Sequence, residues 1–194
     1  EATYTLAKED IGSKIKVKVS YQNAINFTAL EATTAKAVDK ADGPVAPTAS
    51  ATDIAVDEAT KGTITVSNAT GGATYEYALE SEQGQDNAWK PMTTSENTAT
   101  AEVGAPGQYV VRVKASDTAN AGATFTVTVY KLIVVPEGKS LPYNGAEQTG
   151  VEVAKEGAYT LTGNTGTEVK SYTATAKLKE NSCYKWVDVG TDQA

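Results

Sequence analysis

The chain has 194 residues, of which 40% are hydrophobic and 21% charged, with no histidine, one cysteine and a formal net charge of −7. Because histidine is absent, catalysis by imidazole and metal ligation by imidazole are excluded. Because there is one cysteine, intrachain disulfides and cysteine-based zinc sites are excluded as well. An acidic chain whose only arginine is Arg112 is a poor ligand for nucleic acid, and no apolar run approaches the ~20 residues that cross a bilayer.

Threonine, alanine and valine dominate the sequence, whereas leucine is scarce, and 16 glycines and six prolines are spread along the chain. Threonine, valine and tyrosine are enriched in strands, and distributed glycine and proline supply turns. We therefore predict an all-β chain. No signal peptide or basic targeting segment is visible, and we expect the chain to start within a longer protein.

Residues 1–42 contain only two or three candidate strands, at 4–6, 14–22 and 27–37. Ile15, Val17 and Val19 alternate with lysines, as in an antiparallel strand with one face on a core. So few strands are marginally stable alone, and we predict a truncated module whose upstream half lies outside the sequence. We expect it to pack on the next module or on another chain, including a homodimer through its free strand edges.

Residues 43–130 follow the Pro/Gly-rich linker 41–47 and contain enough strands for a complete domain. Seven short strands separated by turns are typical of a two-sheet β-sandwich. This segment holds ten acidic and four basic residues, a net charge of −6. The predicted strands are 49–56, 62–68, 74–80, 88–92, 98–103, 108–116 and 123–130.

Residues 131–194 form a third predicted module, which begins abruptly near Lys131 and so leaves little freedom at the boundary. Tyr143-Asn144-Gly145 is a turn signal. A short strand, a turn and a long alternating strand recur in all three segments, which favours a tandem array. The predicted strands are 132–135, 150–154, 159–162, 170–179 and 184–189.

Several of these motifs are similar to known repeats. Tyr4-Thr5-Leu6 followed by Asp10-Ile11-Gly12 resembles the ending of bacterial immunoglobulin-like repeats in Gram-positive surface proteins. Tyr143-Asn144-Gly145 with Tyr159-Thr160-Leu161 resembles another repeat of secreted Firmicutes proteins, and residues 43–130 resemble immunoglobulin or fibronectin type III sandwiches. The resemblance implies tandem immunoglobulin-like or fibronectin type III-like β-sandwich modules, the first truncated, in an extracellular array without catalytic residues.

No motif in the sequence predicts catalysis or a cofactor. Nucleophile elbows, phosphate-binding loops and metalloprotease signatures are absent from the sequence, and Gly71-Gly72 is placed as a turn between strands. The acidic runs lack the spacing of a calcium loop, so we expect solvated turn carboxylates and no metal site. A Lys–Asn isopeptide crosslink needs a lysine in the core, and the alternation places the strand lysines on polar faces. The two acidic runs are Asp53, Asp57 and Glu58, and Glu80, Glu82 and Asp86.

Three aromatic residues are the candidates for contact with a glycan or a protein partner: Trp89, Tyr143 and Trp186. Sugar-binding modules use flat exposed rings, whereas tryptophan in a sandwich usually packs in the core. Tyr143, beside Asn144-Gly145, is the best candidate for an exposed ring. Exposure of Trp89 or Trp186 would favour a carbohydrate-binding module, and burial of both would favour a spacer.

We therefore expect a non-catalytic structural or adhesion module of a bacterial cell-surface or secreted protein. It would act as a spacer or display stalk whose loops contact a host or cell-surface protein or glycan. The alternative is a carbohydrate-binding module. We expect neither a nucleic-acid partner nor a membrane-spanning segment.

Overall fold

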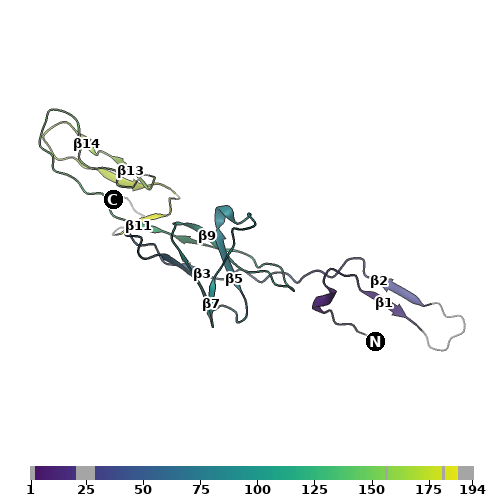
Figure 1. Cartoon of the computed structure of the whole chain (residues 1–194). Coiled ribbons are helices and arrows are strands. Elements are labelled where there is room, and N and C mark those ends of the chain that lie inside the picture. The colour runs from purple at the N-terminus through teal and green to yellow at the C-terminus, as the bar shows by residue number, and fades with distance from the viewer. Residues whose placement is uncertain (1–2, 21–28, 156, 181, 188–194) are drawn as a thin grey trace.

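The chain is an all-β protein whose sheets follow one another along an elongated molecule (Figure 1). A computed structural model describes residues 3–20, 29–155, 157–180 and 182–187. Within these ranges the regular elements are short strands and two single-turn 3-10 helices, η1 (Lys8–Asp10) and η2 (Glu80–Glu82). The all-β prediction is therefore confirmed.

Two four-stranded antiparallel sheets occupy the centre of the chain. Their strand orders are β3-β4-β8-β7 and β10-β9-β5-β6. All seven strands predicted for residues 43–130 are present; β8 has the predicted bounds, β9 begins one residue earlier and ends sooner, the other five are shorter, and β7 is an additional strand. The strands are β3 (Ala49–Ala51), β4 (Gly62–Ser67), β5 (Tyr75–Leu79), β6 (Lys90–Pro91), β7 (Thr93–Ser95), β8 (Thr98–Val103), β9 (Gly107–Val113) and β10 (Phe125–Val129).

These two sheets share one hydrophobic core. Ile64 of β4 and Ala99 of β8 contribute from one sheet, and Val111 of β9 and Val129 of β10 from the other; all four are fully buried. Successive side chains of a strand point to opposite faces, so the alternating sequence of β4 places one residue in two in this core. Burial of each large aliphatic side chain contributes about 1.5–3 kcal/mol, which makes this core the main source of stability.

Residues 131–187 form three two-stranded sheets around a second, smaller core. β11 pairs in parallel with β16, β12 with β14, and β13 with β15. Ala158, Tyr159, Ala176 and Trp186 are buried together. The strands are β11 (Lys131–Ile133), β12 (Gln148–Thr149), β13 (Tyr159–Thr162), β14 (Thr165–Gly166), β15 (Thr175–Leu178) and β16 (Tyr184–Trp186).

Two of the predicted elements in this segment differ from the structure. The strand expected at 150–154 is absent. The Gly150 N–H donates to Asn164 O and the Gly150 carbonyl accepts the Lys139 N–H, and neither of these partners belongs to a strand. The region 163–168, expected to be a turn, contains β14. Part of the strand expected at 184–189 lies outside the described residues.

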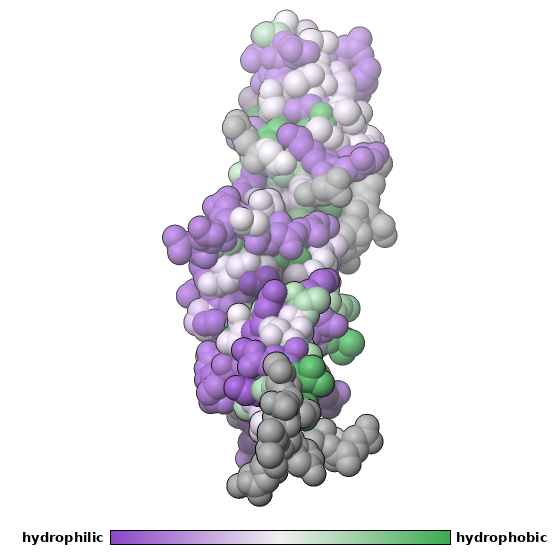
Figure 2. Space-filling model, turned by 90° about the vertical axis from the view of Figure 1, so that its right-hand side faces the viewer, coloured by the Kyte–Doolittle hydropathy of each residue, from purple (hydrophilic) through white to green (hydrophobic). Residues whose placement is uncertain are grey.

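Residues 3–20 and 29–42 contain an antiparallel pair of β1 (Lys16–Val19) and β2 (Leu30–Thr33). Every residue of both strands is exposed, so the central sheets do not cover the β1 face, and its packing on another chain or on an upstream half stays a prediction. Figure 2 views the molecule from this end and shows apolar surface among polar side chains. Parts of the expected strands 14–22 and 27–37 lie outside the described residues, and self-association through these edges stays a prediction.

The strand expected at 4–6 is replaced by an irregular segment that leads into η1. The Tyr4 hydroxyl donates to the Asp10 carboxylate at 2.9 Å, and the same carboxylate accepts the Ala7 N–H at 2.8 Å. Asp10 closes the turn locally, so the backbone of residues 4–6 is not in a ladder. The local capping interaction has prevailed over the strand propensity of Tyr-Thr-Leu.

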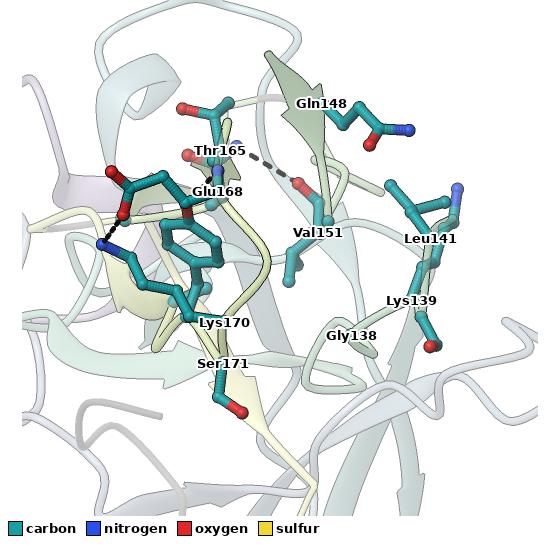
Figure 3. A pocket seen from close by; sticks show the side chains of 16 residues that line it. Gly138, Lys139, Leu141, Gln148, Val151, Thr165, Glu168, Lys170 and Ser171 are labelled. Carbon is teal, nitrogen blue, oxygen red and sulfur yellow. Dashed lines mark hydrogen bonds and ion pairs between the residues drawn. The ribbon is translucent and has the colours of Figure 1, made fainter. Parts of the chain in front are cut away.

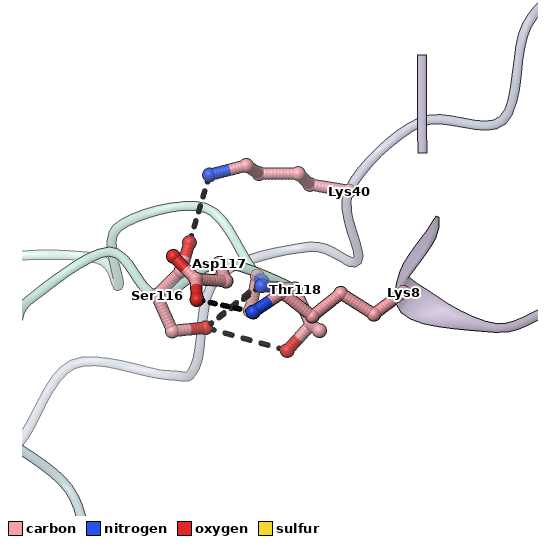
Figure 4. Close-up of polar contacts among 6 residues, drawn as sticks. Lys8, Lys40, Ser116, Asp117 and Thr118 are labelled. Carbon is pink, nitrogen blue, oxygen red and sulfur yellow. Dashed lines mark hydrogen bonds and ion pairs between the residues drawn. The ribbon is translucent and has the colours of Figure 1, made fainter. Parts of the chain in front are cut away.

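The linker after the hairpin is hydrogen-bonded to the β9–β10 loop (Figure 4). The Ala41 N–H donates to Thr118 O and the Asn120 N–H donates to Ala41 O, both at 2.9 Å. Lys40 Nζ donates to Ser116 O at 2.7 Å, and Lys8 pairs with Asp117 at 2.5 Å. The contact of residues 3–42 with the central sheets thus involves the linker and Lys8, whereas the hairpin strands stay exposed.

A nearly continuous run of strand connects the two cores. Only Tyr130 separates β10 from β11, and its carbonyl accepts the Ile54 N–H at 2.8 Å, while the Leu132 N–H donates to Ile54 O at 2.9 Å. Lys185 Nζ lies 3.0 Å from Asp53 and 4.0 Å from the centre of the Tyr130 ring. Backbone and side-chain contacts therefore fix the second core on the end of the central sheets.

Lys131 lies at this junction with only 6% of its surface exposed. Its ammonium group pairs with the carboxylate of Glu58, which lies in the turn between β3 and β4 and is itself largely exposed. The hydrogen bond from Lys131, together with its charge, lowers the pKa of Glu58 below the ordinary value of 4.5. A buried ammonium group without a partner is strongly unfavourable, so Glu58 stabilises the junction.

We predict that Glu58→Gln destabilises the chain most near neutral pH. Because the pKa of Glu58 is lower in the folded state, the ion pair stabilises the fold above about pH 4.5, and this contribution is lost as the pH falls through the folded-state pKa. Urea unfolding at pH 7 and pH 3 measures the difference between the wild type and the variant.

The exposed Glu96→Gln variant is the matched control, and it should unfold as the wild type does at both pH values. A Glu58→Gln variant as stable as the wild type at pH 7 would contradict the role given to the ion pair.

Candidate functional site

Trp186, the first of the aromatic candidates, lies in the second core. It is 1% exposed, and its ring centre lies 5.1 Å from that of Tyr159 at an interplanar angle of 54°. Its Nε1 is buried and has no hydrogen-bond partner among the residues that the structure covers. Trp186 therefore packs as a core residue, and its ring offers no face to a ligand.

Trp89 lies beside the outer face of the β10-β9-β5-β6 sheet, where its ring is covered on one side. The Arg112 guanidinium carbon is 3.6 Å from the ring centre, and Nε1 donates to Gln83 O at 3.0 Å. Arg112 Nε donates in turn to Glu76 Oε1 at 2.7 Å. This stack of indole, guanidinium and carboxylate orders the loop between β5 and β6.

The same face contains two further buried residues outside the shared core. Ala78 and Val110 are opposite each other in the β5–β9 register, on the face of Glu76 and Arg112. Val110 faces outward, as the alternation of the predicted strand 108–116 requires, but it is buried on that face. The half-buried Trp89 packs against Arg112 on this face, which gives it a structural role there.

Tyr143 is the exposed aromatic among the three candidates, with 66% of its surface accessible. The turn that follows it has the predicted conformation: Asn144 Oδ1 accepts the Ala146 N–H at 2.9 Å, and Gly145 has a φ of +78°. Only glycine adopts this φ readily, which explains the Asn-Gly pair. The structure thus does not bring the three candidates together on one surface: Trp186 lies in a core, Trp89 in a stack with Arg112, and Tyr143 beside a turn.

A groove that the sequence analysis did not predict opens between residues 138–151 and 163–174 (Figure 3). Its larger part is a hollow of about 480 Å³, and a second hollow of about 320 Å³ continues from it. In Figure 3, Thr165, Glu168 and Lys170 line one side, and Gln148 and Val151 lie on the other. The sequence signal that could have indicated this groove is the high glycine content of a segment with few strands. The glycines that line the groove are Gly138, Gly150, Gly163 and Gly166.

Tyr172 lines both hollows of this groove. Its hydroxyl accepts the N–H groups of Thr167 and Glu168 at 3.1 and 2.8 Å, which orders the β14–β15 loop. The ring packs flat against Gly166, where a Cβ atom would lie 2.2 Å from the ring. Although the alternation placed Tyr172 on an apolar strand face, it lies before β15 and is 43% exposed.

The first of the two acidic runs considered for calcium is engaged in other interactions. Asp53 pairs with Lys185, Glu58 pairs with Lys131, and Asp57 Oδ1 accepts the Ala59 N–H at 3.0 Å. In the described ranges, no three acidic or cysteine side chains are grouped to hold a metal ion. Lys131, the buried lysine, was not among the strand lysines that the sequence analysis considered.

No family model, curated protein or solved structure matches this chain. Within the part of the chain that the structure describes, no helix is long and apolar enough to cross a bilayer.

We predict that Trp186→Ala is the more damaging of the two tryptophan substitutions. Loss of a buried indole costs about 3–5 kcal/mol, whereas Trp89→Ala removes an exposed cation–π contact and one hydrogen bond, about 1–2 kcal/mol. Urea unfolding followed by circular dichroism compares the two. A larger loss of stability for Trp89→Ala would contradict the assignment of Trp186 to the core.

Proposed function

We propose that this chain is a non-catalytic spacer or display stalk of a bacterial cell-surface or secreted protein, built from tandem immunoglobulin-like β-sandwich modules. The observation that supports this proposal best is the pair of hydrogen-bonded connections on either side of the central sheets. Flexible linkers leave neighbouring domains free to rotate, whereas bonded linkers hold them at a fixed distance. A fixed separation is what a stalk has to provide.

The order of the central strands supports an immunoglobulin-like assignment. Strands β3 to β10, lettered A, B, C, C′, D, E, F and G, give sheets A-B-E-D and G-F-C-C′. An immunoglobulin constant-type domain has ABED opposite CFG, to which this chain adds C′. Tyr109, near the start of β9, donates its hydroxyl to Ala105 O at 2.8 Å. This contact has the form of the tyrosine corner found at the start of strand F in such domains.

The distribution of charge and aromatic rings favours a spacer over recognition by exposed tryptophan. Trp186 is buried and Trp89 is covered on one side by Arg112, so Tyr143 is the candidate whose ring is mainly exposed. The segment 43–130 has a net charge of −6, which favours solubility and disfavours binding to anionic polymers. Adhesion to a host or cell-surface protein or glycan would then depend on loops and on the last segment.

We predict that insertion of Gly-Ser-Gly-Ser between Tyr130 and Lys131 makes the molecule flexible without unfolding either core. The insertion separates β10 from β11, so that Tyr130, which bonds the Ile54 N–H, is no longer directly followed by the strand whose Leu132 N–H donates to Ile54 O. Small-angle X-ray scattering should show a broader distribution of interatomic distances than for the wild type.

The same insertion between Gly71 and Gly72, in the exposed turn between β4 and β5, is the control and should leave the distribution unchanged. Equal scattering from all three proteins would contradict a rigid junction and, with it, the stalk.

We also predict that the parent protein displays this chain outside the cell. Antibodies raised against residues 43–130 should label intact cells of the organism that makes it, or the culture medium, without permeabilisation. Labelling that requires permeabilised cells would overturn the extracellular assignment.

A further inference from the structure

The two hollows of the last segment form one continuous groove with a polar and an apolar end. They have four lining residues in common, Gly138, Val151, Tyr172 and Ala174. The larger hollow is lined by glycines, by hydroxyl and amide side chains and by the charged Lys139, Glu168 and Lys170, and the smaller one mainly by aliphatic side chains with Pro136. Ligand sites of proteins have this combination and a volume of roughly 300–1,000 Å³.

The walls of the groove are tied together, so the groove exists before a ligand arrives. The Gly150 N–H donates to Asn164 O at 2.8 Å, the Lys139 N–H donates to Gly150 O at 2.7 Å, and Asn164 Nδ2 donates to Val151 O at 3.1 Å. The space between the walls can take a side chain at Gly150: a Cβ there would make ordinary van der Waals contacts, 3.8 Å from Asn164 O and 4.0 Å from Lys139 O. Preorganisation lowers the entropic cost of binding.

The charges at the groove are already neutralised within the chain. Lys139 pairs with Glu152 and Lys170 with Glu168, both at 2.8 Å. The Lys139 hydrogen bond and charge lower the pKa of the Glu152 carboxyl below its ordinary value of 4.5. With each lysine matched by a carboxylate, the groove has little net charge to attract an ionic ligand.

The remaining lining groups suit a neutral ligand with many hydroxyls. The side chains of Ser140, Gln148 and Ser171 line the groove and make no hydrogen bond within the described part of the chain. Leu141 and Tyr172 present exposed apolar surface next to them. We propose that this groove binds a neutral oligosaccharide, whose hydroxyls meet these polar groups and whose C–H faces meet Leu141 and Tyr172.

An extended peptide fits the groove less well. Peptides that add a strand to a sheet need a long edge of free backbone groups. The strands beside the groove, β12 and β14, have two residues each and already pair with each other. The site is separate from the stalk role, because it depends on residues 138–172 and not on either connection.

The test is a titration of the full chain with cellotetraose, xylotetraose, mannotetraose and chitotetraose, followed by nuclear magnetic resonance. We expect at least one of them to shift the amide signals of residues 138–151 and 163–172. Gly150→Leu fills the space between the walls and should weaken binding roughly tenfold or more. Gly84→Leu, at an exposed loop glycine with open space around it, is the matched control and should bind as the wild type does.

A second variant, Gln148→Ala, removes a polar lining group without adding bulk, and it should also weaken binding while the spectrum stays folded. Absence of shifts with all four sugars at roughly millimolar concentration would overturn the proposal. So would binding that both groove variants leave unchanged, or shifts of the same residues by a neutral Ser/Thr/Ala peptide or by heparin but by none of the sugars.

Discussion

The backbone that runs from β10 through Tyr130 into β11 is the constraint on which the rest of the structure depends. Val129 at one end of this run is buried in the first core and Ile133 at the other end in the second. Strand geometry allows about 3.3 Å per residue, so two cores whose residues Val129 and Ile133 are four positions apart must lie next to each other. Ile54 is hydrogen-bonded to Tyr130 O and to the Leu132 N–H, on the two sides of Lys131, and so restrains rotation about this connection.

A junction of this kind explains why charged residues are buried where the two cores meet. The backbone of Lys131 belongs to β11, with its N–H bonded to Cys183 O, and its side chain is buried although it is charged. Glu58 and Asp53 supply the negative charges, each from a turn of the central sheets facing a lysine of the last segment. The junction thus combines an apolar interior with two ion pairs that favour one orientation.

The aromatic residues contribute mainly to folding. Tyr109 closes the corner before β9, Trp186 packs on Tyr159, and Trp89 holds Arg112 over the outer face of a sheet. The groove, in contrast, is lined by glycines, hydroxyl and amide side chains, aliphatic side chains and paired charges, with Tyr172 as its aromatic residue. Both tryptophans are already used for packing, so an expected pattern of exposed tryptophans does not indicate where recognition takes place. Such a pattern misses a groove that contains no tryptophan.

The sequence alone determined the all-β class, the positions of the central strands and the turn at Asn144-Gly145, because these depend on local propensity and on a period of two. It did not reveal that Val110 is buried on an outward face, that Lys131 lies in an interior, or that the β1 face is exposed. Each of these depends on what packs against the strand from a distant part of the chain. The groove depends on tertiary structure for the same reason. Gly150 and Gly166 are 16 positions apart in the sequence, where each indicates only a turn, and they line one hollow only after folding.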